Sequence, residues 1–414
     1  MEPEGSTEKD SCWKGTSEKK LDEAQEELLK ISGIGHDQFK MYKVGFEFDQ
    51  NYELKDDVPY EEMKHNESIG SFKAMELEKN IDPYSGKKLK PKKLYSTPKC
   101  CFVPCCCCCK KKIERITKEY IMTYEIGDKS NPTIVLIHGY GGSGMIFFRI
   151  FKHLAEKYHV YAIDLLGMGR SSRPKFLPRS KDEADNFFVQ SIEKWRESMD
   201  IKNLTIVAHS FGAYVASRYA LKHYDNVSKL ILWSPHGCEP KPDGYEEFLK
   251  RRMKENCKFR WFLRAMLCIF KYECRPDRCL KMCGRCSGCF IKRYVKRRMV
   301  GLEEDEIPIA YRYIYQITMR NGSGERAIFK LMKMPILAYT PIYDELDKFK
   351  EHGIDLAFVY GDRDWMNTDM NEINISAQLQ QKGEKVYILD NADHHLYLDN
   401  PKQLCETLDT CMSE

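Results

Sequence analysis

Short apolar segments, each about the length of one β-strand, recur along the chain from about residue 116 and alternate with segments of helical pattern. Thr133–Ile137 (TIVLI) and Leu204–Ala208 are nearly continuous apolar runs, which is typical of strands buried on both faces. Such strands, separated by helices, predict an α/β fold with a mainly parallel central sheet. The other predicted strands are Lys118–Glu125, His159–Ile163, Lys229–Trp233, Leu356–Tyr360 and Lys385–Leu389.

The 414 residues are enough for one sizeable core with an insertion. We expect residues 1–115 to be a polar N-terminal extension of partial order at best, with a short helix over Ser17–Lys30. Residues 116–236 and 351–414 form the two parts of the core, and residues 237–350 are an insertion that caps it. Predicted helices in the core cover Met145–Tyr158, Gly212–His223, a long segment ending near Met199 and a segment near Ser376.

Ser210 lies in Ala208-His209-Ser210-Phe211-Gly212, between a buried strand and a helix. A sharp strand-to-helix turn in this position lifts a serine hydroxyl above the sheet, and Gly212 permits close packing of the helix. Ala208 stands where the first glycine is usual, and is small enough for the turn. A serine in such a turn is also commonly an ordinary helix cap, so its partners decide between the two interpretations.

A glycine-rich turn, His138-Gly139-Tyr140-Gly141-Gly142-Ser143, follows the TIVLI strand. Its backbone N–H groups can point at the carbonyl oxygen of a substrate that Ser210 attacks. We expect the N–H groups of Tyr140 and Phe211 to form this oxyanion hole. The alternatives are a plain turn or a weak phosphate loop, but no Gly-Lys-Ser/Thr follows, so we expect no nucleotide cofactor.

An acid and a histidine follow Ser210 in the order Ser, Asp, His. Asp364 lies just after a predicted strand, and we prefer it to Asp362, which we expect to be structural or solvent-facing. His394 follows the last strand, and its neighbour His395 competes with it. In the predicted triad, His394 takes the proton of Ser210 and Asp364 holds the imidazole and stabilises its charged form.

With these residues the chain resembles the α/β-hydrolase-domain subfamily that contains the N-acyl phospholipid lysophospholipase and the lipid-droplet lipase coactivator. The resemblance covers about residue 116 to the end and leaves out the Cys-rich part of the insertion. It implies an α/β-hydrolase fold and a serine esterase acting on phospholipids or lysophospholipids in lipid metabolism. The motifs that carry it are Asp164–Pro174 (DLLGMGRSSRP), Phe188–Arg196, Tyr313–Lys330 and His394–Pro401.

The resemblance leaves two other functions open. His394 and Asp399 have the His-x4-Asp spacing that the family shares with glycerolipid acyltransferases, which raises acylation of lysophosphatidic acid to phosphatidic acid. If His394 serves Ser210, it cannot also be an independent acyltransferase base, so we expect Asp399 to order its loop. The third interpretation is a non-catalytic scaffold that regulates a lipase; the coactivator branch has lost the nucleophilic serine, but this chain keeps Ser210.

Basic residues are concentrated in the insertion, where 17 Lys or Arg and three acidic residues lie between Lys250 and Arg298. This excess predicts an anionic membrane as a partner, and since no nucleic-acid-binding module is present we expect no nucleic-acid partner. Phe259–Phe270 (FRWFLRAMLCIF) fits either a helix in a membrane interface or a cap helix packed on the core. No stretch of 18 uncharged apolar residues and no signal-peptide pattern is present, so we expect a cytoplasmic protein peripheral to a membrane: lipid droplet, mitochondrion or endomembrane.

Two cysteine clusters complete the pattern. The first precedes Lys110-Lys111-Lys112 and resembles an S-acylation cluster beside a polybasic patch, with metal binding or a plain linker as alternatives. Its predicted lipidation sites are Cys105, Cys106, Cys107, Cys108 and Cys109. The second fits S-acylation, a structural zinc site or no function, and no metal is favoured because a clean paired Cys-x2-Cys arrangement is lacking. It consists of Cys274, Cys279, Cys283, Cys286 and Cys289.

Overall fold

The structure is a computed structural model that describes residues 16–50, 116–240 and most of 251–414. In the last range it leaves out positions 252, 255–256, 272, 274–279, 281, 284–285, 334–336 and 369–372. The described residues up to 50 and from 116 onwards form one compact unit, to which the following description refers.

An eight-stranded sheet forms the centre of this unit, with the strand order β1-β2-β4-β3-β5-β6-β9-β10. From β4 to β10 all neighbours are parallel, whereas β1 and β2 are antiparallel to their neighbours. This is the α/β-hydrolase fold that the sequence predicts. The strands are β1 Phe39–Asp49, β2 Ile116–Ile126, β3 Thr133–Ile137, β4 His159–Ile163, β5 Leu204–His209, β6 Val227–Trp233, β9 Asp355–Gly361 and β10 Lys385–Leu389.

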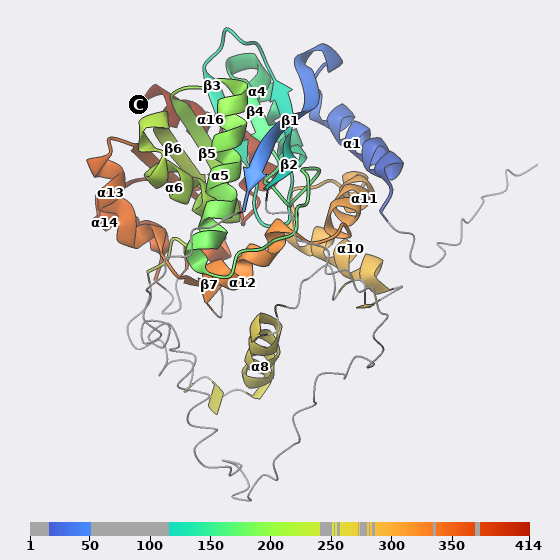
Figure 1. Ribbon diagram of the computed structural model, residues 1–414, viewed down its shortest axis with the longest axis vertical. Coiled ribbons are helices and arrows are strands. Elements are labelled where there is room, and N and C mark those ends of the chain that lie inside the picture. Colours follow the sequence, from blue (N-terminus) through green and yellow to red (C-terminus); the bar gives the residue numbers. More distant parts are fainter. Residues whose placement is uncertain are drawn as a thin grey trace, which may run out of the picture. The chain divides into compact units, whose positions relative to one another are not determined.

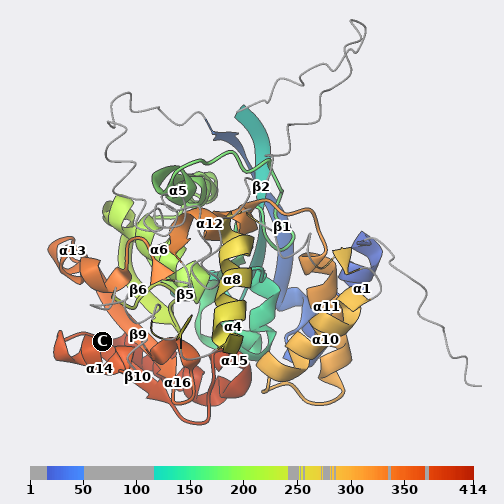
Figure 2. The ribbon, with the colours of Figure 1, turned by 90° about the horizontal axis from the view of Figure 1, so that it is seen from below.

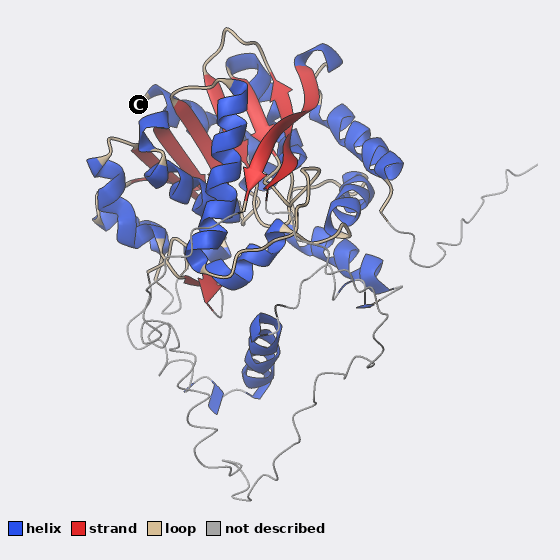
Figure 3. Cartoon of the chain, in the orientation of Figure 1, coloured by secondary structure: helices blue, strands red, loops and turns tan. Residues whose placement is uncertain are grey.

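Helices cover both faces of the sheet (Figures 1 and 3). Along β3 alternate side chains enter opposite cores: Ile134 and Leu136 pack on one side, and Val135 and Ile137 on the other. The first core includes α4 and α16, and the second includes α5 and α6. These helices are α4 Phe151–Lys157, α5 Lys181–Met199, α6 Phe211–Lys222 and α16 Pro401–Ser413.

One predicted helix is different in the structure. The segment Met145–Tyr158 forms a 3₁₀ helix over Gly144–Ile150 and then α4. Ser143 caps the 3₁₀ helix by accepting a hydrogen bond from the Met145 N–H at 3.3 Å. A side chain at Gly144 would lie within 3.1 Å of Ala162, so the segment starts tightly against the sheet. Apolar periodicity shows the buried face but cannot distinguish these two helix types over one turn.

The predicted boundary at residue 116 is wrong for the N-terminal segment, because α1 (Glu18–Ser32) and β1 belong to the core unit. Ser17 caps α1 by accepting from the Lys20 N–H, and Gly33 ends it at φ 69°. β1 pairs with β2 along its full length, from Phe39 opposite Ile126 to Asp49 opposite Ile116. Phe48 is 1% exposed, so this strand contributes to the core as well as to the edge of the sheet.

Most of the insertion is helical, and α1, α10 and α11 lie side by side at one end of the sheet (Figure 2). In α8, Leu263 is buried and the Phe270 ring contacts Phe329 at 5.3 Å, whereas Trp261 is 71% exposed. Part of α8 therefore packs as a cap helix.

In the described ranges no helix is long and apolar enough to cross a bilayer. The insertion contains α8 Cys257–Lys271, α10 Ser287–Arg298, α11 Glu306–Thr318, α12 Ile328–Leu331, β7 Met332–Lys333, β8 Leu337–Ala338 and α13 Leu346–Glu351; α14 Ile375–Gln381 and α15 Leu396–Asp399 follow in the core.

Candidate active site

The predicted site residues meet at the carboxyl edge of the parallel strands. The register places Ile137 of β3 opposite Ala208 of β5, and Trp233 of β6 opposite Val359 of β9. The loops that leave these strands therefore start at the same level, where ligands of open α/β sheets bind. The same edge receives the loop after β10, which carries His394.

Ser210 occupies a strained turn between β5 and α6, with φ 54° and ψ −121°. Its backbone N–H donates to the Trp233 carbonyl at 3.0 Å, which holds the turn against the neighbouring strand. A Cβ atom at Gly212 would lie 2.3 Å from the His138 carbonyl oxygen, so only glycine allows α6 to start this close to β3. The predicted elbow is thus present, and its backbone strain is the kind that concentrates at functional sites.

His394 lies directly beside Ser210, with 3.0 Å between His394 Nε2 and Ser210 Oγ. Its position is fixed from two directions. The His394 backbone N–H donates to the Asp393 carboxylate at 2.7 Å, and the ring Nε2 of His209 lies 2.9 Å from the His394 carbonyl oxygen. The Nε2 of His394 is thereby aimed at the serine hydroxyl before any substrate arrives.

Asp364 is on the other side of the imidazole, with its Oδ1 at 3.4 Å from His394 Nδ1. Its side chain is fully buried, and Oδ1 accepts a hydrogen bond from the Met366 N–H at 2.9 Å. His394 Nδ1 and Asp364 Oδ2 have no hydrogen-bond partner in the described part of the chain. Asp362, the alternative acid, has a side chain that is 40% exposed, and it accepts from the Ala392 N–H as a structural residue.

The other histidines around Ser210 are buried and neutral. Burial, together with the charge of His394, lowers the pKa of His236 and that of His395 to about 3. His395 Nδ1 is 2.8 Å from the Tyr397 hydroxyl, away from Ser210. Burial, with further lowering by His394 and His395, also holds the pKa of His209 well below its usual value. Of the two adjacent candidates it is therefore His394, and not His395, that contacts the serine.

The glycine-rich turn approaches Ser210 as expected. A Cβ atom at Gly139 would lie 3.0 Å from Ser210 Cβ, so this backbone passes directly over the serine. Phe211 is the first residue of α6, where a backbone N–H has no acceptor within the helix. The Tyr140 ring meets Phe211 edge-on at 5.9 Å, and its hydroxyl donates to the Glu325 carbonyl at 3.0 Å. The side chains of Tyr140 and Phe211 thus lie in contact beside Ser210, and the oxyanion role of their backbone N–H groups stays a prediction.

Asp164 is a supporting residue that the sequence alone did not single out. Its fully buried carboxylate accepts from the backbone N–H groups of Gly144 and Arg170, both at 2.6 Å. It thereby links the end of the glycine-rich turn to the DLLGMGRSSRP segment. The signal was present in the sequence as an acid directly after a buried strand, the same context that identified Asp364.

Asp399 orders the His394 loop, as predicted. Its two carboxylate oxygens accept from the backbone N–H of Asp393 at 3.0 Å and of Gly301 at 3.1 Å. Burial raises its pKa, while these two backbone hydrogen bonds act in the opposite direction. Asp399 therefore ties the His394 loop to the segment of the insertion that follows α10.

The cysteine predictions are tested only in part. Cys105 to Cys109, Cys274 and Cys279 lie outside the described residues. Cys283, Cys286 and Cys289 are exposed and free. Within the described ranges no group of three or more His, Cys, Asp or Glu side chains is placed to hold a metal ion.

The sheet and the strained serine turn at its carboxyl edge define the class of protein, an α/β hydrolase. A model of the alpha/beta hydrolase fold family matches residues 132–255. The "1-acylglycerol-3-phosphate O-acyltransferase" of Arabidopsis thaliana is 32% identical over 291 residues, which cover 68% of this chain and 67% of that protein.

Two animal proteins are also similar to this chain. The "1-acylglycerol-3-phosphate O-acyltransferase ABHD5" of Sus scrofa is 31% identical over 67% of this chain and 78% of its own length. The "(Lyso)-N-acylphosphatidylethanolamine lipase" of Homo sapiens is 27% identical over 70% of this chain and 84% of its own length. The chain belongs to the α/β-hydrolase-domain family of these lipid-metabolising proteins.

Proposed function

We propose that this protein is a membrane-associated serine hydrolase that cleaves acyl esters of phospholipids or lysophospholipids. The observation that carries the proposal is the 3.0 Å contact between His394 Nε2 and Ser210 Oγ, with the buried Asp364 carboxylate behind the imidazole. A buried carboxylate that is not otherwise neutralised stabilises an imidazolium, which is the charged form that a general base acquires.

The reaction proceeds in two steps in this proposal. Ser210 Oγ attacks the acyl carbonyl while His394 Nε2 takes its proton, and the N–H groups of Tyr140 and Phe211 stabilise the oxyanion. His394 then gives this proton to the departing alcohol oxygen of the lipid, which leaves an acyl ester on Ser210. Water, activated by His394, hydrolyses this ester and releases the fatty acid.

A lipid substrate is supported by the names of the relatives, which include a (lyso)-N-acylphosphatidylethanolamine lipase. The proposed location is the cytosolic face of a membrane, supported by the basic insertion described above.

Labelling with a fluorophosphonate probe tests the activated serine. We expect the full-length protein to be labelled and the variants Ser210→Ala and His394→Ala to lose labelling. The exposed residues Ser198 and His36 provide matched controls, since Ser198→Ala and His36→Ala make the same chemical changes far from the site. A folded wild-type protein that is not labelled would contradict the proposal and favour the non-catalytic lipase-regulating scaffold.

Acyl transfer is the second candidate, because two of the relatives carry an acyltransferase name. A lysophosphatidic acid hydroxyl can resolve the same acyl-enzyme in place of water, and the product is then phosphatidic acid. Purified protein given acyl-CoA and lysophosphatidic acid distinguishes the two outcomes. If phosphatidic acid forms and Ser210→Ala abolishes it, the acyl group passes through Ser210; if the activity survives Ser210→Ala, the triad is not used.

A further inference from the structure

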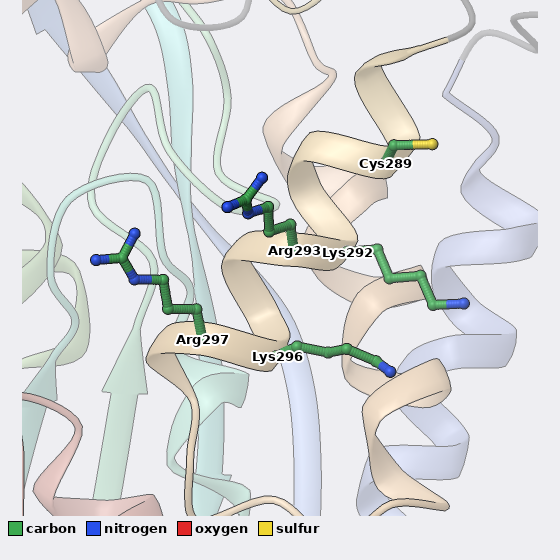
Figure 4. A pocket seen from close by; sticks show the side chains of 5 residues that line it. All are labelled: Cys289, Lys292, Arg293, Lys296 and Arg297. Carbon is green, nitrogen blue, oxygen red and sulfur yellow. The ribbon is translucent and has the colours of Figure 1, made fainter.

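The outer face of α10 carries a concentration of positive charge. Lys292 and Lys296 are one helical turn apart, as are Arg293 and Arg297, so the four cations form two adjacent rows. Figure 4 shows these rows, with Cys289 one turn before Arg293. Together the five residues line a shallow depression of about 400 Å³.

The opposite face of α10 explains why the helix is held in this orientation. Ile291 and Val295 are 4% and 0% exposed and pack into the core cluster. At 100° per residue they lie almost opposite the middle of the cationic face. The two rows are therefore held towards solvent by the packing of the helix and are not free to turn inwards.

The four cations differ from the basic residues around them, because they have no ion pair or side-chain hydrogen bond in the described part of the chain. On the neighbouring helix, Arg312 pairs with Glu27 of α1. In the segment that follows, Arg326 and Lys330 both pair with Glu273, at 2.8 Å and 2.7 Å. Local acids thus neutralise these three basic side chains of the insertion, whereas no acid of the described residues pairs with the four cations of α10.

Leaving these charges unpaired opposes folding of the helix. Lys292 with Lys296 and Arg293 with Arg297 are like-charged pairs at i,i+4, an arrangement that destabilises a helix. The helix dipole favours cations in the last turn only, so it accounts for Lys296 and Arg297 but not for the preceding pair. An external anion would remove the repulsion from all four side chains.

Large apolar side chains border the same face. Phe290 is 54% exposed and Tyr294 is 48% exposed, and both lie beside the cationic rows on the helix. Basic residues mixed with exposed aromatic rings are typical of a surface that lies on a bilayer, where rings enter the headgroup layer and cations meet lipid phosphates.

We infer that the outer face of α10 is a docking surface for a membrane rich in anionic phospholipid. Its partners on the protein side are Lys292, Arg293, Lys296 and Arg297, with Phe290 and Tyr294 entering the headgroup layer. This inference names the surface through which the proposed enzyme binds its membrane. It rests on the proposed function only for the statement that the docked membrane supplies the substrate.

The position of the docking surface relative to the active site supports this role. The Arg298 guanidinium, at the end of α10, stacks over the Trp365 ring at 5.5 Å. The Trp365 ring lies 5.4 Å from the His394 ring and is 44% exposed. A membrane docked on α10 therefore lies next to the residues that border Ser210.

Vesicle flotation with the unlipidated full-length protein tests the inference. The variant Lys292→Gln/Arg293→Gln/Lys296→Gln/Arg297→Gln should lose roughly 1000-fold in its partition onto phosphatidylcholine vesicles containing about 30% phosphatidylserine. Binding of the wild type should be weak on phosphatidylcholine alone and should fall with rising salt. The matched control replaces four exposed lysines without ion pairs, Lys152, Lys175, Lys202 and Lys402, by Gln and should change the partition by less than about threefold.

The inference is overturned if the α10 variant binds anionic vesicles as the wild type does, or if the control loses as much as the α10 variant. It is also overturned if the wild type binds a single-stranded RNA through α10 but no vesicles. The α10 variant should melt at or slightly above the temperature of the wild type, because the like-charge repulsion is removed, and it should keep its turnover of a soluble short-chain ester. An inactive wild type that still shows the α10-dependent partition would contradict the proposed hydrolase and leave the docking surface intact.

Discussion

Replacing Ser210 by glycine should stabilise the fold while abolishing activity. At φ 54° and ψ −121° the serine backbone is in a region that only glycine adopts without strain. Such strain costs about 1–3 kcal/mol, whereas glycine costs about 0.5–1 kcal/mol through its greater freedom in the unfolded chain. We therefore expect Ser210→Gly to be more stable than Ser210→Ala by about 1 kcal/mol. Both variants lose the contact with His394, so that contact cancels in the comparison.

The assay is urea unfolding of both variants, followed by thermal melting, in which about 2 °C should separate them. Ser198, exposed on α5, supplies the matched comparison. Its backbone is helical, so Ser198→Gly should be less stable than Ser198→Ala by about 1 kcal/mol. The sign of the glycine-minus-alanine difference must therefore reverse between the two positions. If Ser210→Gly is less stable than Ser210→Ala by the amount seen at position 198, the turn is not strained and the argument fails.

Three further changes test the surroundings of the site. His209→Phe removes the ring N–H that faces the His394 carbonyl at 2.9 Å and should slow fluorophosphonate labelling about tenfold without changing the melting temperature; an unchanged rate would remove this positioning role. His236 and His395 have pKa values of about 3 in the folded protein, so the fold should be acid-labile. Their contribution to stability is complete above 6.5, the pKa of histidine in the unfolded chain. As the pH falls from there to about 3, each should lower the free energy of unfolding by about 1.4 kcal/mol per pH unit. Urea midpoints across this range measure the slope, and a flat profile would mean that the two rings are protonated in the fold. Asp399→Asn should lower stability by about 2 kcal/mol and slow labelling, because two backbone N–H groups lose a charged acceptor; loss of acyl transfer with an unchanged melting temperature would instead favour a direct role of this acid.

The central strands were predictable because each is buried on both faces. β3 and β4 have the predicted bounds, and β5 and β6 differ by no more than two residues at either end. β10 also has the predicted bounds, although it lies at the edge of the sheet and only its Leu389 is buried. A continuous apolar segment of five residues between turns has few other structures available to it. The placement of Ser210, Asp364 and His394 followed from the same information, since each lies just after a strand and parallel strands bring their carboxyl ends to one edge of the sheet.

What was not predictable depends on contacts between distant parts of the chain. No local pattern in the sequence states that Asp399 binds the Gly301 N–H or that Asp164 binds the Gly144 N–H, because these bonds depend on the packing of separate loops. The choice between His394 and His395 was equally undetermined. It depends on the direction of each ring, which is set when the Tyr397 hydroxyl engages His395.

The sequence analysis did not predict β1, the strand of the N-terminal segment. β1 lies at the edge of the sheet, and only Val44 and Phe48 of its eleven residues are buried, with Tyr42 and Phe46 partly buried on the same face. The alternation of apolar and polar residues from Tyr42 to Asp49 is typical of a half-buried strand, and the sequence analysis overlooked it. β1 is a strand because β2 provides backbone partners along its whole length. α1 is held in a similar way: Arg170, from the segment tied to Asp164, donates to Gln25 of α1 at 2.9 Å. The folded unit therefore begins well before the segment that resembles the family, and its N-terminal part is connected through Asp164 to the glycine-rich turn that faces Ser210.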